Sequence, residues 1–187
     1  MVHKALEWTI PILWLIWLAY WLIEARNTAV TQRSESPLTA VVYRGATVVG
    51  LVLIFGLKRP PTQLWPVTVP LRCVAVILAL GGFSFAIWAR RHIGRYWSAR
   101  VTLKEGHQLI ESGPYRLARH PIYSGLLLSM AATVTTIGTI QSVVGYVLLV
   151  GALVFKLAAE ERLLTANFGE AYKEYQNRVK ALIPGVI

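Results

Sequence analysis

The sequence predicts an all-α integral membrane protein with five transmembrane helices, and three observations support this prediction. Of its 187 residues, 55% are hydrophobic and only 15% are charged, and the mean hydropathy is +0.51. A soluble domain of this size carries more charge. Apolar runs recur along the chain, and each has about the 20 residues that a helix needs to cross the hydrocarbon region. No flexible linker or repeat divides the chain, so we expect one membrane domain over residues 1–187.

The predicted helices follow from five apolar runs, at residues 5–23, 39–57, 66–88, 121–137 and 140–159. The first run lacks the small-residue cleavage site of a signal peptide and is followed by Glu24 and Arg26, so we expect it to be retained, with a bend at Pro11. The uncharged stretch 138–142 separates the last two runs. This short separation predicts a tight turn and therefore a helical hairpin.

The positive charges predict the orientation of the protein. The formal net charge is +10, with 19 lysines and arginines. Most of these cations fall in the connections after the first and third runs and in the C-terminal tail, which share one side of a five-span protein. The positive-inside rule places that side in the cytoplasm and the N-terminus outside. Charges spread along a membrane boundary indicate contact with anionic lipids, so we expect no nucleic-acid partner.

The segment from Arg90 to His120 is the only long connection of the predicted fold, and loops of this length usually carry function. Pro121 favours a helix start at that residue, because the missing amide of a first-turn proline has no helical partner. The amides and the positive dipole end of this helix, beside Arg119 and His120, favour an anionic group such as an amino-acid carboxylate. An equally good interpretation is that Arg119 reaches lipid phosphates and His120 caps the helix.

Two adjacent glutamates lie at the cytoplasmic end of the fifth run. Both the nearby lipid and the negative helix end disfavour carboxylates there. Lys156 precedes Glu160 by one helical turn and can pair with it. That pair leaves Glu161 without a partner, which favours a polar ligand at this position.

A short tail helix is predicted after Gly169, with Tyr172, Tyr175 and Arg178 at three-residue spacing. Aromatic residues at this spacing either anchor a helix at the membrane interface or line a pocket. The histidines lack zinc-ligand spacing and Cys73 is the single cysteine, so we expect no metal site. Glycine-rich nucleotide-binding motifs are also absent from the sequence.

Two motifs together resemble the isoprenylcysteine carboxyl methyltransferase family, within the wider group of membrane phospholipid methyltransferase-like proteins. The first motif begins at His107 and contains Gly113-Pro114-Tyr115 and Arg119-His120-Pro121-x-Tyr123-x-Gly125. The second contains Glu160-Glu161 and Phe168-Gly169-x-x-Tyr172-x-x-Tyr175-x-x-Arg178. The resemblance covers roughly the last two thirds of the chain. Residues 1–65 match weakly, so residues 90–187 are expected to form the cofactor-binding and catalytic region.

The resemblance implies a five-helix membrane enzyme that uses S-adenosylmethionine, with S-adenosylhomocysteine as product, to methylate the carboxylate of a prenylcysteine or similar lipophilic acceptor. Its pocket faces the cytosol. The implied catalytic residues are Arg119, Lys156 and Glu160. The implied cofactor-binding residues are His107, Leu109, Tyr115, His120, Tyr123 and Glu161, and the implied substrate-binding residues are Trp97, Tyr172, Tyr175 and Arg178. The family commonly has arginine at the position of Lys156.

Other functions share parts of this pattern. Related membrane methyltransferases act on a phospholipid amine or a small thiol, and an amine acceptor requires a general base. Sterol reductases contain a similar C-terminal region, which implies a nicotinamide cofactor. A small transporter or structural membrane protein, with Arg44 and Lys156 along a path, is the non-enzymatic alternative.

Overall fold

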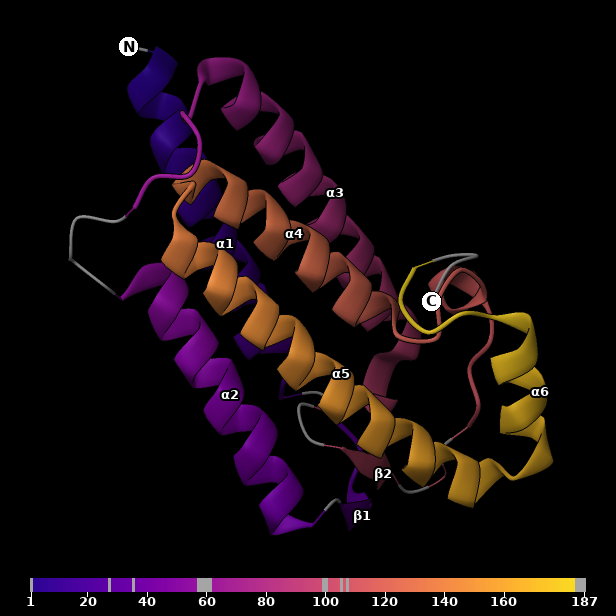
Figure 1. Cartoon of the computed structure of the whole chain (residues 1–187). Coiled ribbons are helices and arrows are strands. Elements are labelled where there is room, and N and C mark those ends of the chain that lie inside the picture. Colours follow the sequence, from indigo (N-terminus) through magenta and orange to yellow (C-terminus); the bar gives the residue numbers. More distant parts are fainter. Residues whose placement is uncertain are drawn as a thin grey trace.

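The computed structural model describes residues 2–26, 28–34, 36–56, 62–98, 101–104, 106 and 108–183. Its helices are α1 (Val2–Glu24), α2 (Pro37–Phe55), α3 (Val69–Ile93), α4 (Pro121–Ile137), α5 (Ile140–Phe168) and α6 (Glu170–Arg178). Two short strands, β1 (Thr31–Ser34) and β2 (Thr102–Lys104), and two 3₁₀ turns, η1 (Gly94–Tyr96) and η2 (Gly113–Arg116), complete it. Figure 1 shows the long helices side by side, with α6 and the strands at one end.

The first five helices lie where the apolar runs predict them. Four segments are long and apolar enough to cross a membrane, namely Leu6–Glu24, Pro37–Phe55, Val69–Tyr96 and Ile140–Phe168. The chain is therefore a multi-pass integral membrane protein. Helix α4 begins at Pro121 as predicted but has 17 residues, fewer than the roughly 20 of a typical span. The fifth crossing remains a prediction.

The predicted all-α class is confirmed, and the structure adds one feature that the sequence did not predict, because β1 and β2 pair as an antiparallel ribbon. Thr31 lies opposite Lys104, and Ser34 lies opposite Thr102. Strands of three and four residues are too short to give a periodic hydropathy pattern, and their pairing depends on a segment about 70 residues away. The ribbon joins the connection after α1 to the connection after α3.

Two close helix crossings hold the bundle together: α3 packs along α4, and α2 packs along α5. A Cβ atom added at Gly82 would lie 2.5 Å from the carbonyl oxygen of Gly125, and one added at Gly50 would lie 2.9 Å from that of Gly145. Small residues at such positions let membrane helices approach closely.

Helices α4 and α5 follow one another through Gly138 and Thr139, where Gly138 adopts a left-handed conformation with φ 71°. Each of these two helices packs mainly against a different helix, α4 against α3 and α5 against α2. The predicted hairpin is therefore not confirmed as a packing unit. The short turn that was expected between the two helices is present.

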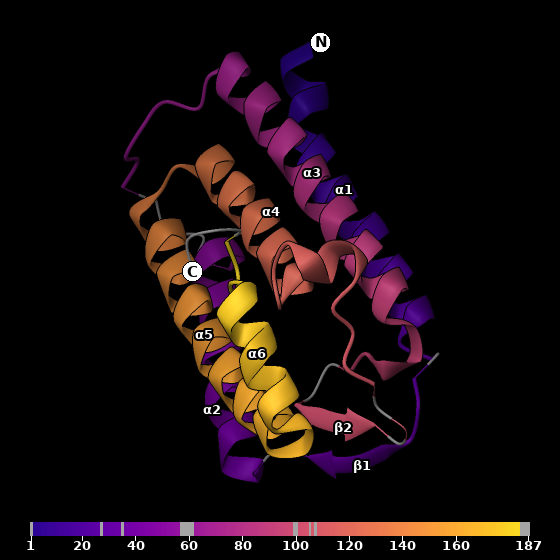
Figure 2. The ribbon, with the colours of Figure 1, turned by 90° about the vertical axis from the view of Figure 1, so that its right-hand side faces the viewer.

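The two ends of the bundle carry different connecting segments. The connections after α1 and α3 and the C-terminal tail lie at one end, together with β1, β2 and α6 (Figures 1 and 2). This agrees with the predicted sharing of one side by these three segments. At the other end, Leu64 donates its amide to the Gly138 carbonyl at 2.8 Å, and the Trp65 indole donates to the Thr135 carbonyl at 2.9 Å.

Candidate functional site

A pocket lies at the strand-bearing end, between the connection that follows α3, the start of α4, the end of α5, and α6. Six aromatic residues contribute to its lining: Tyr96, Trp97, Tyr115, Tyr123, Tyr172 and Tyr175. Its polar lining includes Thr102, Gln108, Arg119, His120 and Glu160. Most of these residues come from the connection and the tail that the sequence singles out.

The two polar motifs meet directly at Glu161. Arg119 donates from Nε to the Glu161 Oε1 at 2.8 Å, and its Nη2 lies 2.7 Å from the same oxygen. The His120 Nε2 lies 3.2 Å from this oxygen, and the Gln176 amide donates to Oε2 at 3.1 Å. Only 16% of the Glu161 side chain is exposed. Side chains from α6 and from the two residues before α4 therefore compensate Glu161, and the need for a ligand partner that we inferred from the sequence disappears.

The C-terminal tail secures the residues that precede α4. Arg119 also donates from Nη1 to the carbonyls of Gln176, at 3.2 Å, and Val179. Its backbone amide donates to the Lys180 carbonyl, and that of His120 donates to the Ala181 carbonyl, both at 2.9 Å. The predicted anion site at the start of α4 is therefore partly filled by the chain itself.

Glu160 has a different hydrogen-bond partner from Glu161. The Tyr123 hydroxyl donates to the Glu160 Oε2 at 2.7 Å, and the Tyr123 ring stacks parallel to the His120 ring at a centroid distance of 5.5 Å. The Lys156 Nζ lies 5.1 Å from the centre of the Tyr123 ring and 5.4 Å from that of Tyr43. Lys156 is buried between these rings, a position in which the two aromatic faces stabilise its charge.

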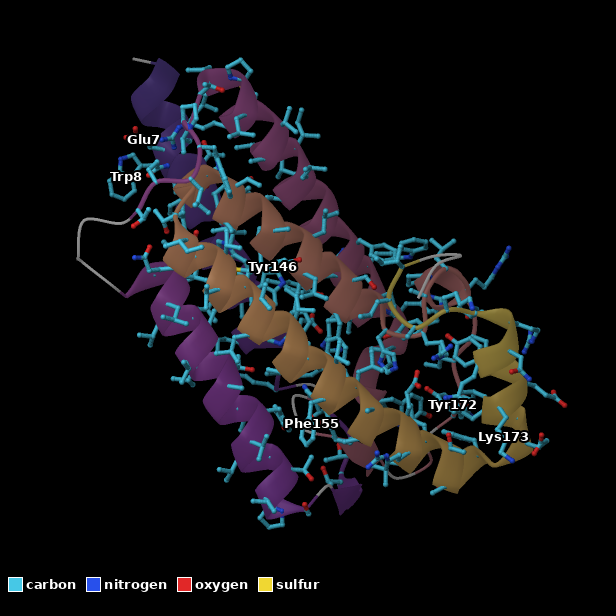
Figure 3. The ribbon with its side chains drawn as sticks, viewed as in Figure 1. Glu7, Trp8, Tyr146, Phe155, Tyr172 and Lys173 are labelled. Carbon is cyan, nitrogen blue, oxygen red and sulfur yellow. The ribbon has the colours of Figure 1, made fainter. Side chains whose placement is uncertain are left out.

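Helix α6 covers the pocket and is attached to the connection before α4. The Tyr175 hydroxyl donates to the Tyr115 carbonyl at 2.6 Å, and Arg178 forms an ion pair with Glu111 at 2.6 Å near the surface. Figure 3 shows Tyr172 between α6 and the helix bundle. Burial raises the pKa of the Tyr115, Tyr172 and Tyr175 hydroxyls, which therefore stay neutral.

A buried arginine that we did not single out from the sequence supports the pocket wall. Arg90, at the end of α3, donates to the carbonyls of Glu24 at 2.6 Å and Gly94 at 2.7 Å. Its guanidinium carbon lies 4.8 Å from the centre of the Trp97 ring. The only sequence signal for this role was a cation at the end of an apolar run, next to the long connection.

The structure brings most of the predicted site residues to the pocket. Those that line it are Trp97, Leu109, Tyr115, Arg119, His120, Tyr123, Glu160, Tyr172 and Tyr175. Glu161 lies behind this wall, in contact with Arg119 and His120, Lys156 lies beneath Tyr123, and Arg178 lies near the surface. His107 lies outside the described residues. Thr102 also lines the pocket, and sequence reasoning missed it.

Comparison with known proteins identifies relatives of the chain. The model of the isoprenylcysteine carboxyl methyltransferase (ICMT) family matches residues 74–166, a range that contains both the Arg119-His120 and the Glu160-Glu161 pairs. Among curated proteins, the chain is 31% identical over 172 residues to methanethiol S-methyltransferase 1 of Bradyrhizobium diazoefficiens, covering 82% of this chain and 57% of that protein.

Plant relatives match a shorter part of the chain. It is 32% identical over 117 residues to protein-S-isoprenylcysteine O-methyltransferase B of Arabidopsis thaliana, covering 62% of this chain and 53% of that protein. It is 35% identical over 86 residues to the probable protein-S-isoprenylcysteine O-methyltransferase of Oryza sativa subsp. indica, covering 46% and 45%. The chain therefore spans about half the length of these curated relatives.

Proposed function

We propose that this chain, which belongs to the isoprenylcysteine carboxyl methyltransferase family, transfers a methyl group from S-adenosylmethionine to the carboxylate of a lipophilic acceptor such as a prenylcysteine. One observation carries this proposal. Arg119 and Glu161, which are 42 residues apart in the chain, meet beside a pocket at the end of a bundle of apolar helices. The relatives, which are named as methyltransferases, support methyl transfer.

The residues of the pocket fit an S-adenosyl compound. Aromatic rings suit both a flat adenine base and a positively charged sulfonium group. Glu160 contributes a carboxylate to the same wall, which favours a cation. The hydroxyls of Thr102 and Tyr172 are buried without a hydrogen-bond partner in the described part of the chain, so a polar ligand can satisfy them. Bound there, S-adenosylmethionine would supply an activated methyl group.

The protein groups would act mainly by positioning the acceptor. A carboxylate acceptor has a pKa of roughly 3 to 4 and is already ionised near neutral pH, so it requires no general base. Arg119 directs its guanidinium to Glu161 and to tail carbonyls, which suits a positioning role. Lys156, behind Tyr123, lowers the electrostatic cost of bringing an anion close to the bundle. The aromatic wall excludes water from that anion.

A small thiol is the second candidate acceptor, because two observations favour it. The methanethiol S-methyltransferase 1 match covers 82% of the chain. Lys156 also replaces the arginine common in the family. An ammonium group cannot form the two parallel hydrogen bonds that a guanidinium group forms with a carboxylate. The thiol of cysteine has a pKa of about 8.5 and is mostly protonated near neutral pH, so the rate with a thiol acceptor should rise with pH through the neutral range.

A labelling experiment separates these acceptors. Membranes that contain the protein are incubated with methyl-labelled S-adenosylmethionine and either a prenylcysteine, a phospholipid amine or a small thiol. We expect label in the prenylcysteine product that base treatment releases, as it does from an ester. Base-stable label in the thiol product alone would select the second candidate, and no transfer to any acceptor would contradict both.

Binding of S-adenosylhomocysteine by the purified protein tests the site itself. Glu161→Gln and His120→Ala should weaken this binding, because each breaks the network that fixes Arg119 and His120. Glu170→Gln is the matched control, because Glu170 is an exposed carboxylate paired with Lys173. Full affinity in both site variants would refute the assignment, and displacement of bound S-adenosylhomocysteine by NADPH would favour a nicotinamide enzyme.

A further inference from the structure

Two buried hydroxyl groups in the pocket wall lack a hydrogen-bond partner within the described ranges, the Thr102 Oγ1 and the Tyr172 hydroxyl. Only 1% of the Tyr172 residue is exposed. A buried polar atom without a partner loses its hydration and gains nothing in return, so such atoms are rare in folded proteins and need an explanation.

Neighbouring hydroxyls show that the site does not lack acceptors in general. Tyr123 donates to Glu160, Tyr175 donates to the Tyr115 carbonyl, and Ser124 donates to the Leu182 carbonyl at 2.6 Å. A third buried hydroxyl, that of Tyr20 on α1, also lacks a partner in the described ranges, but Tyr20 does not line the pocket. Thr102 and Tyr172 do line it, so a ligand in the pocket can supply the partners of these two hydroxyls.

The two hydroxyls belong to different walls. Thr102 lies on β2, opposite Ser34 of β1, and follows Tyr96 and Trp97, whose flat rings line the same pocket. Tyr172 lies on α6, next to the charged groups. Burial is the main cause of its raised pKa, and Glu161 contributes next, followed by the opposing effect of Arg119. The aromatic wall suits a flat base, and the charged corner suits an amino acid.

We propose that the Thr102 and Tyr172 hydroxyls are hydrogen-bonding contacts for the S-adenosyl cofactor, with Thr102 serving its nucleoside and Tyr172 serving its amino-acid part. This inference rests on the proposed function and extends it to two specific atoms. It assigns the β1–β2 ribbon a role in the site, because β1 holds the strand that carries Thr102. Both hydroxyls are pre-positioned by the fold and gain their partners when the cofactor binds.

The assignment predicts opposite effects on folding and on binding. Removing a buried hydroxyl that has no partner leaves the free protein as stable as before, or more stable, whereas removing one that is bonded lowers stability. Thr102→Val replaces the hydroxyl with a methyl group of similar shape, and Tyr172→Phe deletes the hydroxyl and keeps the ring. Tyr175→Phe is the matched control, because its hydroxyl is already bonded to the Tyr115 carbonyl.

The experiment measures thermal unfolding of the ligand-free protein in detergent and its affinity for S-adenosylhomocysteine and for 5′-methylthioadenosine, which lacks the amino acid. Thr102→Val should weaken both ligands about fivefold, as expected for one neutral hydrogen bond. Tyr172→Phe should weaken only S-adenosylhomocysteine by about the same factor. Neither variant should lower the unfolding temperature, whereas Tyr175→Phe should lower it.

Three results would overturn the inference. Wild-type affinity in both variants would show that the hydroxyls do not contact the ligand. A fall in the unfolding temperature as large as that of Tyr175→Phe would show that they have protein partners. An equal loss of both ligands in Tyr172→Phe would overturn its assignment to the amino-acid part. If the wild-type protein binds neither ligand, the proposed function itself fails.

Discussion

The helix crossings and the polar end of this protein are held together in different ways. In the bundle, α3 meets α4 and α2 meets α5 where the glycines Gly82 and Gly50 leave no room for a side chain of their own. At the polar end, Arg119, His120 and Glu161 are fixed by hydrogen bonds between charged groups. The helix crossings therefore require positions without a side chain, and the polar end requires its paired hydrogen-bond donors and acceptors. Variants that add a side chain should act on the first region, and variants that remove a charge should act on the second.

The largest effect is expected from a side chain placed in a helix crossing. Gly82→Leu puts a Cβ atom 2.5 Å from the Gly125 carbonyl oxygen, so α3 and α4 must separate. Overpacking of a core typically costs about 1 to 3 kcal/mol and occasionally more, and here the obstacles are backbone atoms of Gly125 and Ser129 together with the Ser129 hydroxyl. We expect little folded protein by size-exclusion chromatography in detergent.

Gly81→Leu is the matched control on the same helix, because a Cβ atom there meets no described atom within 4 Å. Gly50→Leu and Gly45→Leu form the corresponding pair on α2, in which Gly50 faces Gly145 and Gly45 faces open space. Equal yields of folded protein from both members of a pair would contradict the view that the crossings depend on the missing side chains.

Loss of one charge at the polar end should have the next largest effect. Arg119→Met leaves Glu161, whose side chain is 16% exposed, without its strongest partner. Breaking a buried ion pair in this way costs about 3 kcal/mol, and the pocket loses the residue that links Glu161 to the tail. We expect a lower unfolding temperature and loss of S-adenosylhomocysteine binding. Lys173→Met is the control, because it breaks the exposed pair with Glu170. An equal loss of stability in this variant would refute the view that the buried pair stabilises the protein more than the exposed one.

Alkaline pH tests the buried tyrosines of the polar end. Burial raises the pKa of Tyr115, Tyr172 and Tyr175, whereas in the unfolded chain tyrosine ionises near pH 10. Above that pH the unfolded state binds fewer protons than the folded state. These tyrosines therefore leave the free energy of unfolding unchanged below about pH 10 and lower it above that pH. Each such tyrosine contributes a loss of roughly 1.4 kcal/mol per pH unit. Tyr172→Phe should reduce this slope, and an unchanged slope in unfolding measurements between pH 9 and 11 would contradict its burial.

Sequence reasoning recovered the helices, because these depend on local information. Apolar runs and helix-starting prolines such as Pro121 mark the helices without reference to other parts of the chain. The residues of the two motifs were identified by resemblance, and most of them line the pocket. The meeting of Arg119 with Glu161 depends on how α4, α5 and α6 pack, which the hydropathy pattern does not encode.

The features that sequence reasoning missed all depend on distant contacts. Gly82 is an ordinary residue of an apolar run until the pairing of α3 with α4 is known. Thr102 belongs to a strand of three residues whose partner follows α1. Arg90 reaches the carbonyl of Glu24 from 66 residues away. A single sequence gives no signal for such pairs, since each partner is unremarkable in its own segment.

The smallest effect is expected from the surface ion pair that attaches α6 to the connection before α4. Arg178 and Glu111 are 2.6 Å apart, with 64% and 32% of their side chains exposed. Exposed pairs contribute about 0 to 1 kcal/mol because water and salt screen them. Arg178→Gln should therefore change the unfolding temperature far less than Arg119→Met, and added salt should abolish the difference from wild type. An effect as large as that of Arg119→Met would mean that the attachment of α6, and not the buried charge network around Glu161, controls the stability of the polar end.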